Sequence, residues 1–146
     1  MKVVVQRVLN ASVKVDNKTV GKIDNGFMIL VGFTHSDEIS DIEYMVKKIS
    51  NLRIFDDENG VMNKSILDVN GSILSISQFT LYADTKKGNR PSYINAMSGE
   101  KATLLYDKFN ELLKEKVNVE TGIFGSEMKV SLINDGPITI ILDSKE

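Results

Sequence analysis

The sequence predicts an α+β protein in which a mainly antiparallel sheet, curled towards a barrel, carries two helices on one side. Two segments repeat their apolar residues at helical spacing, and most other apolar residues lie in short β-rich runs separated by turn residues. The 146 residues show no repeat, linker or shift in composition, so we expect a single domain over residues 1–146.

Both helices are predicted from apolar residues that recur every three or four positions. The first runs from Ile39 to Ile49, and Ser36–Glu38 before it supply a cap and an acidic first turn. The second runs from Ala102 to Leu113, with Ser98 as the expected N-cap and Glu100 near the positive helix end. Each helix is apolar on one side only, so each should lie on the sheet.

The rest of the fold is predicted to be strands. They are Val3–Val8, Ser12–Asp16, Thr19–Ile23, Phe27–Phe33, Ser72–Tyr82, Met128–Ile133 and Ile138–Leu142. Asp24-Asn25-Gly26 is a strong hairpin turn. Asp135-Gly136 also predicts a hairpin, although Pro137 then opens a strand without an amide donor. Sequence alone favours a trans bond before Pro137, because only about 5–6% of X–Pro bonds in folded proteins are cis.

Composition excludes several kinds of site. The chain has 18 basic and 20 acidic residues, a net charge of −2, so overall charge does not hold it to nucleic acid. It has no cysteine and one histidine, which excludes disulfides, thiolate metal sites, cysteine nucleophiles and multi-histidine metal sites. We therefore expect no metal and no cofactor. The histidine, His35, has no evident partner in the sequence and is expected to be a loop residue.

The apolar runs are short. The run at the N-terminus ends at Val5, which is too short for a signal-peptide core. The longest apolar stretch, residues 26–33, is far below the roughly 20 residues that a membrane span needs. We expect a cytoplasmic protein that does not contact a membrane.

Ser77-Gln78-Phe79-Thr80 forms the first unusual polar cluster, at the end of a predicted strand. Strand alternation would place Gln78 and Thr80 on one face, and Ser77 and Phe79 on the other. A hydroxyl and an amide at the rim of the core can hold a polar substrate atom. The alternative is a strand end with one solvated face.

A basic loop follows. From Asp84 to Arg90 there are three basic residues, Lys86, Lys87 and Arg90, and one acidic residue, a net charge of +2 in a slightly acidic chain. Basic residues on a flexible loop close to Tyr93 suit phosphate and single-stranded RNA. A solvated loop is the alternative.

Taken in order, these clusters resemble the D-aminoacyl-tRNA deacylases over essentially the whole chain. The matching pieces are Arg7, Ala11-Ser12-Val13, residues 77–84, residues 88–92, Thr121-Gly122, Phe124-Gly125 and Asn134-Asp135-Gly136-Pro137. Ser126 is a departure, since many relatives would carry alanine there.

The resemblance implies an esterase without a cofactor. Such proteins hydrolyse the ester that joins a D-amino acid, or glycine, to the 3′-terminal adenosine of tRNA. It also implies a homodimer with active sites at the subunit interface. By match, Gly136 and Pro137 would form a cis bond that reaches into the partner's pocket and rejects an L side chain by a clash. Arg7 would brace that segment.

The resemblance also assigns the other site residues. The backbone amides around Phe79 and Thr80 would stabilise the oxyanion, with Ser77 and Gln78 in the same site. Thr80 is either a nucleophile or a group that positions the ester or a water, assisted by the ribose 2′-OH. We favour positioning, because no base is visible beside it. Phe124, Met128 and Ala102 would line the pocket, and Lys86, Lys87 and Arg90 would contact the tRNA acceptor end.

Three alternatives stay open. The chain is an RNA-binding module that has kept the fold without catalysis, a deacylase for an L-amino acid mischarged on tRNA, or a small-molecule D-amino acid esterase that ignores RNA. Intact Gln78, Thr80, Gly136 and Pro137 argue against the first, and the basic loop at 86–90 argues against the third. Which D-amino acids are preferred, and whether glycyl-tRNA is a main target, does not follow from the sequence.

Overall fold

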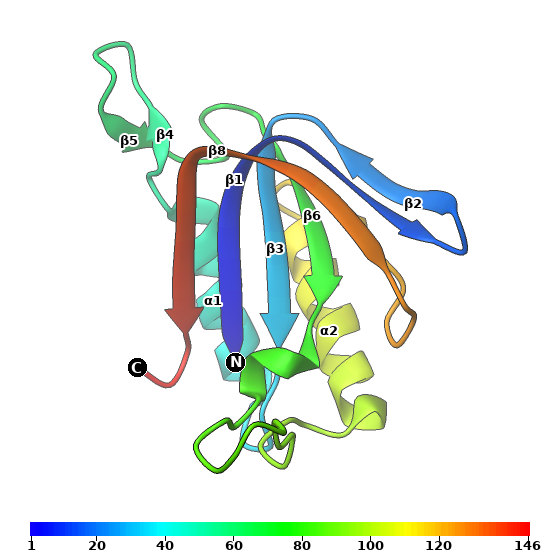
Figure 1. Cartoon of the computed structure of the whole chain (residues 1–146). Coiled ribbons are helices and arrows are strands. Elements are labelled where there is room, and N and C mark those ends of the chain that lie inside the picture. Colours follow the sequence, from blue (N-terminus) through cyan, green and yellow to red (C-terminus); the bar gives the residue numbers. More distant parts are fainter.

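A computed structural model describes the whole chain, residues 1–146, as a strongly twisted sheet with two helices on one face (Figure 1). The main sheet has the strand order β2-β1-β3-β6-β7, and β8 also pairs with β1. The strands are β1 (Lys2–Val15), β2 (Lys18–Ile23), β3 (Gly26–Gly32), β4 (Phe55–Asp56), β5 (Met62–Lys64), β6 (Ser72–Ser77), β7 (Asn118–Thr121) and β8 (Lys129–Asp143). The helices are α1 (Ile39–Asn51), the short 3-10 helix η1 (Phe79–Tyr82) and α2 (Gly99–Lys114).

Two long strands, β1 and β8, curl the sheet. The first half of β1 pairs with β3 and its second half pairs with β2, while β8 runs antiparallel to β1 along nearly its whole length. The sequence predicted four separate strands here, and that was wrong. The ladder continues through irregularities between Gln6 and Ala11, which bend both strands without ending them. The predicted hairpin at Asp135-Gly136 is therefore a bend inside β8. The hairpin predicted at Asp24-Asn25-Gly26 was also wrong, because β2 and β3 both pair with β1 and not with each other.

The main sheet also contains a parallel part. The three ladders of β1 are antiparallel, but β3, β6 and β7 lie parallel to one another. Helix α1 lies between β3 and β6 in the chain, and α2 lies between β6 and β7. Each helix is thus the crossover that a parallel pair requires. The sheet is therefore mainly antiparallel, as predicted, with a parallel part that the sequence did not indicate.

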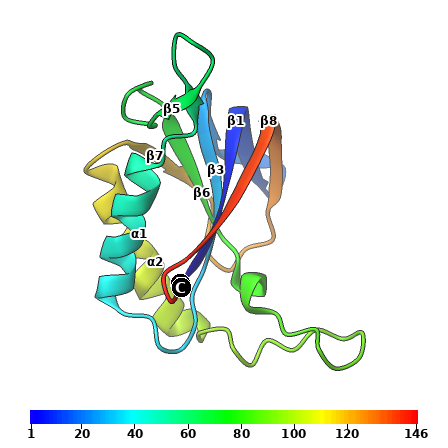
Figure 2. The same cartoon turned by 90° about the vertical axis from the view of Figure 1, so that its left-hand side faces the viewer.

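The helices lie where the apolar periodicity placed them, side by side on one face of the sheet (Figure 2). Glu38 caps α1 through a reciprocal capping box with Asp41, and Ser98 is the N-cap residue of α2. Side chains between the helices and the sheet form the main core, and a second apolar cluster fills the curl of β1, β2 and β8. Neither helix has the length and hydropathy that crossing a bilayer would need.

Candidate active site

A cavity of about 530 Å³ opens at the ends of β3 and β6, beside the start of α2. Six of the residues that the sequence singled out line it: Ser77, Gln78, Phe79, Ala102, Phe124 and Met128. They come from three separate parts of the chain, which the parallel β3–β6 pair and the crossover helix bring together. Ser126, the departure from the family pattern, also faces this cavity.

The strand that carries the first cluster ends earlier than predicted. β6 stops at Ser77, and Phe79–Tyr82 turns into η1. The predicted alternation is therefore wrong, and Ser77, Gln78 and Phe79 all line the same cavity. Because η1 begins with a hydrogen bond from Leu81 N–H to the Gln78 carbonyl (3.3 Å), the N–H groups of Phe79 and Thr80 have no acceptor within the turn.

Gln78 and Thr80 are joined directly. The Gln78 backbone N–H donates to the Val31 carbonyl (2.7 Å), which fixes the residue at the end of the sheet. Its side-chain Nε2 donates to Thr80 Oγ1 at 2.6 Å. The Thr80 hydroxyl, having accepted this bond, keeps its own hydrogen to donate to a ligand. None of the residues that line the cavity has an ionisable side chain.

Aromatic side chains support the wall of the cavity opposite the segment Ser77–Phe79. The ring of Phe124 lies against that of Tyr106, with 5.7 Å between their centroids. Tyr106 is buried, and its hydroxyl donates to the Ser75 carbonyl at 2.8 Å. Burial raises the pKa of this hydroxyl above its usual range, although hydrogen bonds to Ser75 and Asn110 act the other way. Tyr106 is thus a neutral support behind Phe124.

Arg7 and the Gly136–Pro137 segment lie elsewhere. Buried Arg7 donates from Nε to the Asp135 carbonyl (3.2 Å) and from Nη1 to the Ile54 carbonyl (2.7 Å), and Nε lies 3.4 Å from the Asp135 carboxylate. The Gly136–Pro137 peptide bond is cis. Gly136 has a φ of +128°, in the region that favours glycine, and an added Cβ would lie 2.8 Å from Ile138 Cγ1.

Register places this segment away from the cavity of the same chain. Arg7 pairs with Phe27 on β3, whereas Ser77 pairs with Val31. Phe27 and Val31 are four residues apart on β3, so the position of Arg7 along the sheet is about 13 Å from that of Ser77. The structure therefore does not bring Gly136 and Pro137 to the cavity within one chain.

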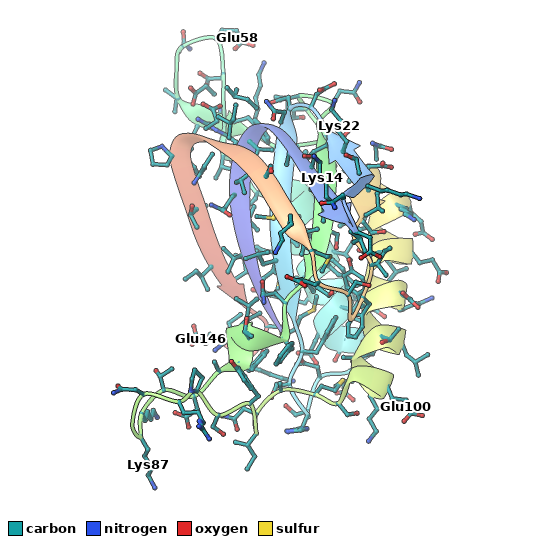
Figure 3. All side chains as sticks on the ribbon, turned by 45° about the vertical axis from the view of Figure 1, so that its right-hand side comes forward. Lys14, Lys22, Glu58, Lys87, Glu100 and Glu146 are labelled. Atoms are coloured by element: carbon teal, nitrogen blue, oxygen red, sulfur yellow. The ribbon has the colours of Figure 1, made fainter.

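The basic loop is also outside the cavity. Lys86, Lys87 and Arg90 are exposed between η1 and α2, and Lys87 lies at the tip of a projecting loop (Figure 3). A pair of backbone hydrogen bonds between Asp84 and Ser92 closes the loop at its base. His35 is a loop residue, as predicted, and its Nε2 lies 2.6 Å from the Ile94 carbonyl.

Several cavity residues escaped sequence analysis. Phe33, which follows β3, Met97, which precedes α2, and Gly99, the first residue of α2, all line it. Apolar residues at the ends of elements look like ordinary core residues, so no signal in the sequence singled them out. No three His, Cys, Asp or Glu side chains lie close enough together to hold a metal ion.

The model of the family described as D-Tyr-tRNA(Tyr) deacylase matches residues 4–143. The chain belongs to this deacylase family. A D-aminoacyl-tRNA deacylase of Bacillus velezensis is 60% identical over 147 aligned positions that span all of both chains. As a member of a deacylase family, this chain is a hydrolase, and the resemblance seen in the sequence is confirmed.

Two solved structures share the fold. The c-Myc DNA Unwinding Element Binding Protein is 42% identical, with a TM-score of 0.93 over 98% of each chain. A probable eukaryotic D-amino acid tRNA deacylase is 20% identical, with a TM-score of 0.82 over 97% of each chain, and this second likeness concerns the fold alone.

Proposed function

We propose that this hydrolase cleaves the ester of D-aminoacyl-tRNA and releases the free D-amino acid and tRNA. The observation that supports the proposal is the cavity that Gln78 and Phe79 line, together with the hydrogen bond from the Gln78 side chain to Thr80 and the N–H groups of Phe79 and Thr80, which have no acceptor within the turn. The full-length match to a D-aminoacyl-tRNA deacylase supports the same substrate. Charged tRNA is used in the cytoplasm, where we propose that the enzyme acts.

The mechanism relies on positioning and on dipoles. The ester carbonyl lies at the rim of the cavity, and water attacks its carbon. The N–H groups of Phe79 and Thr80 stabilise the oxyanion that develops. The bond to the ribose 3′ oxygen then breaks, and this oxygen takes up the proton that the water gives up, assisted by the neighbouring 2′-OH. An aminoacyl ester is already activated, so positioning supplies much of the acceleration.

Thr80 positions the substrate and is not a nucleophile in this proposal. Its hydroxyl oxygen accepts a hydrogen bond from Gln78 at 2.6 Å, and no ionisable side chain lines the cavity to remove its proton. A threonine without a base is a weak nucleophile. Ser77 lines the same cavity, where its hydroxyl can orient the attacking water. Ala102, Phe124 and Met128 enclose the amino-acid side chain.

Selection against L-amino acids is proposed to need a second copy of the chain. Gly136 and Pro137 are exposed and lie about 13 Å along the sheet from the cavity of their own chain. In a homodimer they enter the partner's cavity, where they clash with an L side chain and leave room for a D side chain or for glycine. The exposed Ile141 (72% accessible), on the sheet face away from the helices, supports such an interface.

The test is hydrolysis of D-tyrosyl-tRNA and L-tyrosyl-tRNA side by side. We expect rapid loss of the D ester only, loss of this activity in Thr80→Ala, and gain of L-ester hydrolysis in Pro137→Ala. A Thr80→Ser variant is the matched control, because it keeps the hydroxyl. Cleavage of the L ester by the unmodified enzyme would favour a deacylase for mischarged L-amino acids. Equal cleavage of D-tyrosine methyl ester would favour a small-molecule esterase.

A second candidate function is nucleic-acid binding without catalysis. The 42% identical solved relative is described as a DNA-unwinding-element binding protein. The exposed residues Lys86, Lys87 and Arg90 would serve such a role, and they would equally contact the tRNA acceptor end in the deacylase. Hydrolysis of neither ester above the spontaneous rate would favour this candidate.

A further inference from the structure

A strip of lysines lies on the outer face of the curl formed by β1, β2 and β8. The strip consists of Lys14, Lys22 and Lys129, all of them exposed. Figure 3 shows Lys14 and Lys22 on the curl, far from Lys87 on the basic loop. The strip is therefore separate from the basic residues that the sequence had singled out.

Strand alternation fixes the direction of these side chains. Val13 is buried inside the curl, where it pairs with Gly21 and Val130. Its neighbours in the strand, Ser12 and Lys14, therefore point outwards. Lys14 pairs directly with Lys129 on β8, and Ser12 pairs with Lys22 on β2. The ladder holds these three lysines in two adjacent rows.

The strands that carry the strip are basic, and the acidic residues nearest to it in the sequence, Asp16, Asp24 and Glu127, lie just beyond the ends of these strands. β1 and β2 contain no Asp or Glu, and β8 contains none before Asp135. Only Lys129 has an ion-pair partner, Glu127 at 2.9 Å, and that pair is highly exposed. Lys14 and Lys22 form no salt bridge. In a chain with a net charge of −2, this is a local concentration of positive charge.

The pairing of Lys14 with Lys129 works against the fold. Like charges directly opposite each other in an antiparallel pair are destabilising, and their Cβ atoms lie only about 5 Å apart. Nothing in the packing requires lysine there, since both side chains are exposed. A polyanion lying across the rows would neutralise both charges at once.

The strip is also next to the cavity. Met128 lines the cavity and Lys129 follows it directly, while Val130 lines the cavity from the inner face of the same strand. A nucleic acid whose 3′ end entered the cavity would continue past this rim. Lysine ammonium groups contact phosphates without reading bases, which suits an enzyme that must accept tRNAs of different sequence.

We propose that the lysine strip is the docking surface for the sugar-phosphate backbone of the tRNA whose 3′ end occupies the cavity. This inference rests on the proposed function, and it names where the body of the substrate binds. Charge complementarity is the ground for choosing tRNA as the occupant. The serines between the lysines, Ser12 and Ser131, add hydroxyl donors on the same face.

The first test measures binding of uncharged tRNA to the full chain against salt concentration. The strip variant carries Lys14→Gln, Lys22→Gln and Lys129→Gln. The matched control carries Lys47→Gln, Lys114→Gln and Lys116→Gln, three exposed helix and helix-end lysines with the same total charge change. Three lost phosphate contacts lower the salt slope by about 2.1–2.7, so the affinity advantage of the unmodified chain shrinks by about 20–40-fold between 50 and 200 mM salt. Equal slopes for the two variants would overturn the proposal.

The second test uses two substrates, D-tyrosyl-tRNA and 3′-O-D-tyrosyl-adenosine, which lacks the tRNA body. The strip variant should raise KM for the tRNA at least tenfold more than for the adenosine ester. An equal effect on both substrates would overturn docking of the tRNA body, as would a loss of duplex-DNA binding with no loss of tRNA binding. If the unmodified chain cleaves neither ester, the proposed function fails, while the first test still decides the strip.

Lys14→Glu separates function from structure. The new carboxylate would lie opposite Lys129 and replace repulsion by attraction, so the melting temperature should stay the same or rise. Binding of tRNA should fall at the same time. Variants whose binding and stability fall together would show that the strip lysines act only through the fold, and the proposal would be wrong.

Discussion

Replacing Arg7 by leucine should lower both the stability and the chiral selectivity of this deacylase. Arg7 is 8% exposed, donates to the carbonyls of Ile54 and Asp135, and lies 3.4 Å from the Asp135 carboxylate. Leucine fills much of the space but leaves two carbonyls without their donor. Unpaired buried groups cost about 1–3 kcal/mol each, so we expect a loss of about 3 kcal/mol in the free energy of unfolding.

For a chain of this length, that loss lowers the melting temperature by roughly 6–12 °C. Urea unfolding followed by circular dichroism measures the free energy, and parallel assays on D- and L-tyrosyl-tRNA measure selectivity. Arg7→Lys is the matched control, since it keeps the positive charge but cannot reach both carbonyls. Its free energy of unfolding should lie between those of the unmodified chain and of Arg7→Leu. If Arg7→Leu melts within 2 °C of the unmodified chain, the bracing role assigned to Arg7 is wrong.

Two further predictions concern pH. Because no ionisable side chain lines the cavity and the proton of the attacking water passes to the ribose 3′ oxygen, kcat for D-tyrosyl-tRNA should vary little from pH 6 to 8, and a bell-shaped profile would reveal a side-chain acid or base. Burial acts to raise the pKa of Asp41, but hydrogen bonds from Glu38 N–H, Ser144 and Lys145 outweigh it and lower this pKa below 3.8. The folded-state pKa is depressed, so this stabilisation is present at neutral pH and is lost as the pH falls below about 4. Asp41→Asn should therefore cost about 1–2 kcal/mol at pH 7 and little near pH 2, as urea unfolding at both pH values would show.

The helices were predictable from the sequence, whereas strand continuity was not. Apolar spacing alone located α1 and α2, because an amphipathic helix needs only local information. Leu9 and Asn10 are both exposed and interrupt the alternation of β1, which suggested a break. The strand continues because β8 pairs with it on both sides of the irregularity. That pairing joins residues more than 100 positions apart in the chain, and no local pattern encodes it.

The candidate site was predictable in its chemistry but not in its geometry. The polar cluster from Ser77 to Thr80 stood out because amides and hydroxyls are unusual after an apolar strand. The geometry of the cluster could not be predicted. A longer strand would have placed Ser77 and Gln78 on opposite faces, but the chain turns into η1 and both residues line the cavity. The lysine strip was invisible for a related reason: Lys14 and Lys129 are neighbours only through the β1–β8 register.

The rigid spacing along β3 constrains how two copies of this enzyme can work together. The Arg7 end and the Ser77 end are held about 13 Å apart by a strand whose residues are mostly buried, so neither end can move to the other within a chain. In a two-fold dimer each contact occurs twice, so the Gly136–Pro137 segment of each chain can enter the cavity of the other. In such a dimer, the groups that promote hydrolysis lie on η1 of one chain, and the residues that reject L-amino acids lie on β8 of its partner. A Thr80→Ala chain mixed with a Pro137→Ala chain should therefore form heterodimers in which one cavity has lost both functions and the other has kept both. After random exchange, such a mixture should cleave the D ester at the rate expected from the sum of its parts but the L ester at only about half of that sum, whereas a site complete within one chain would leave both rates at the sum.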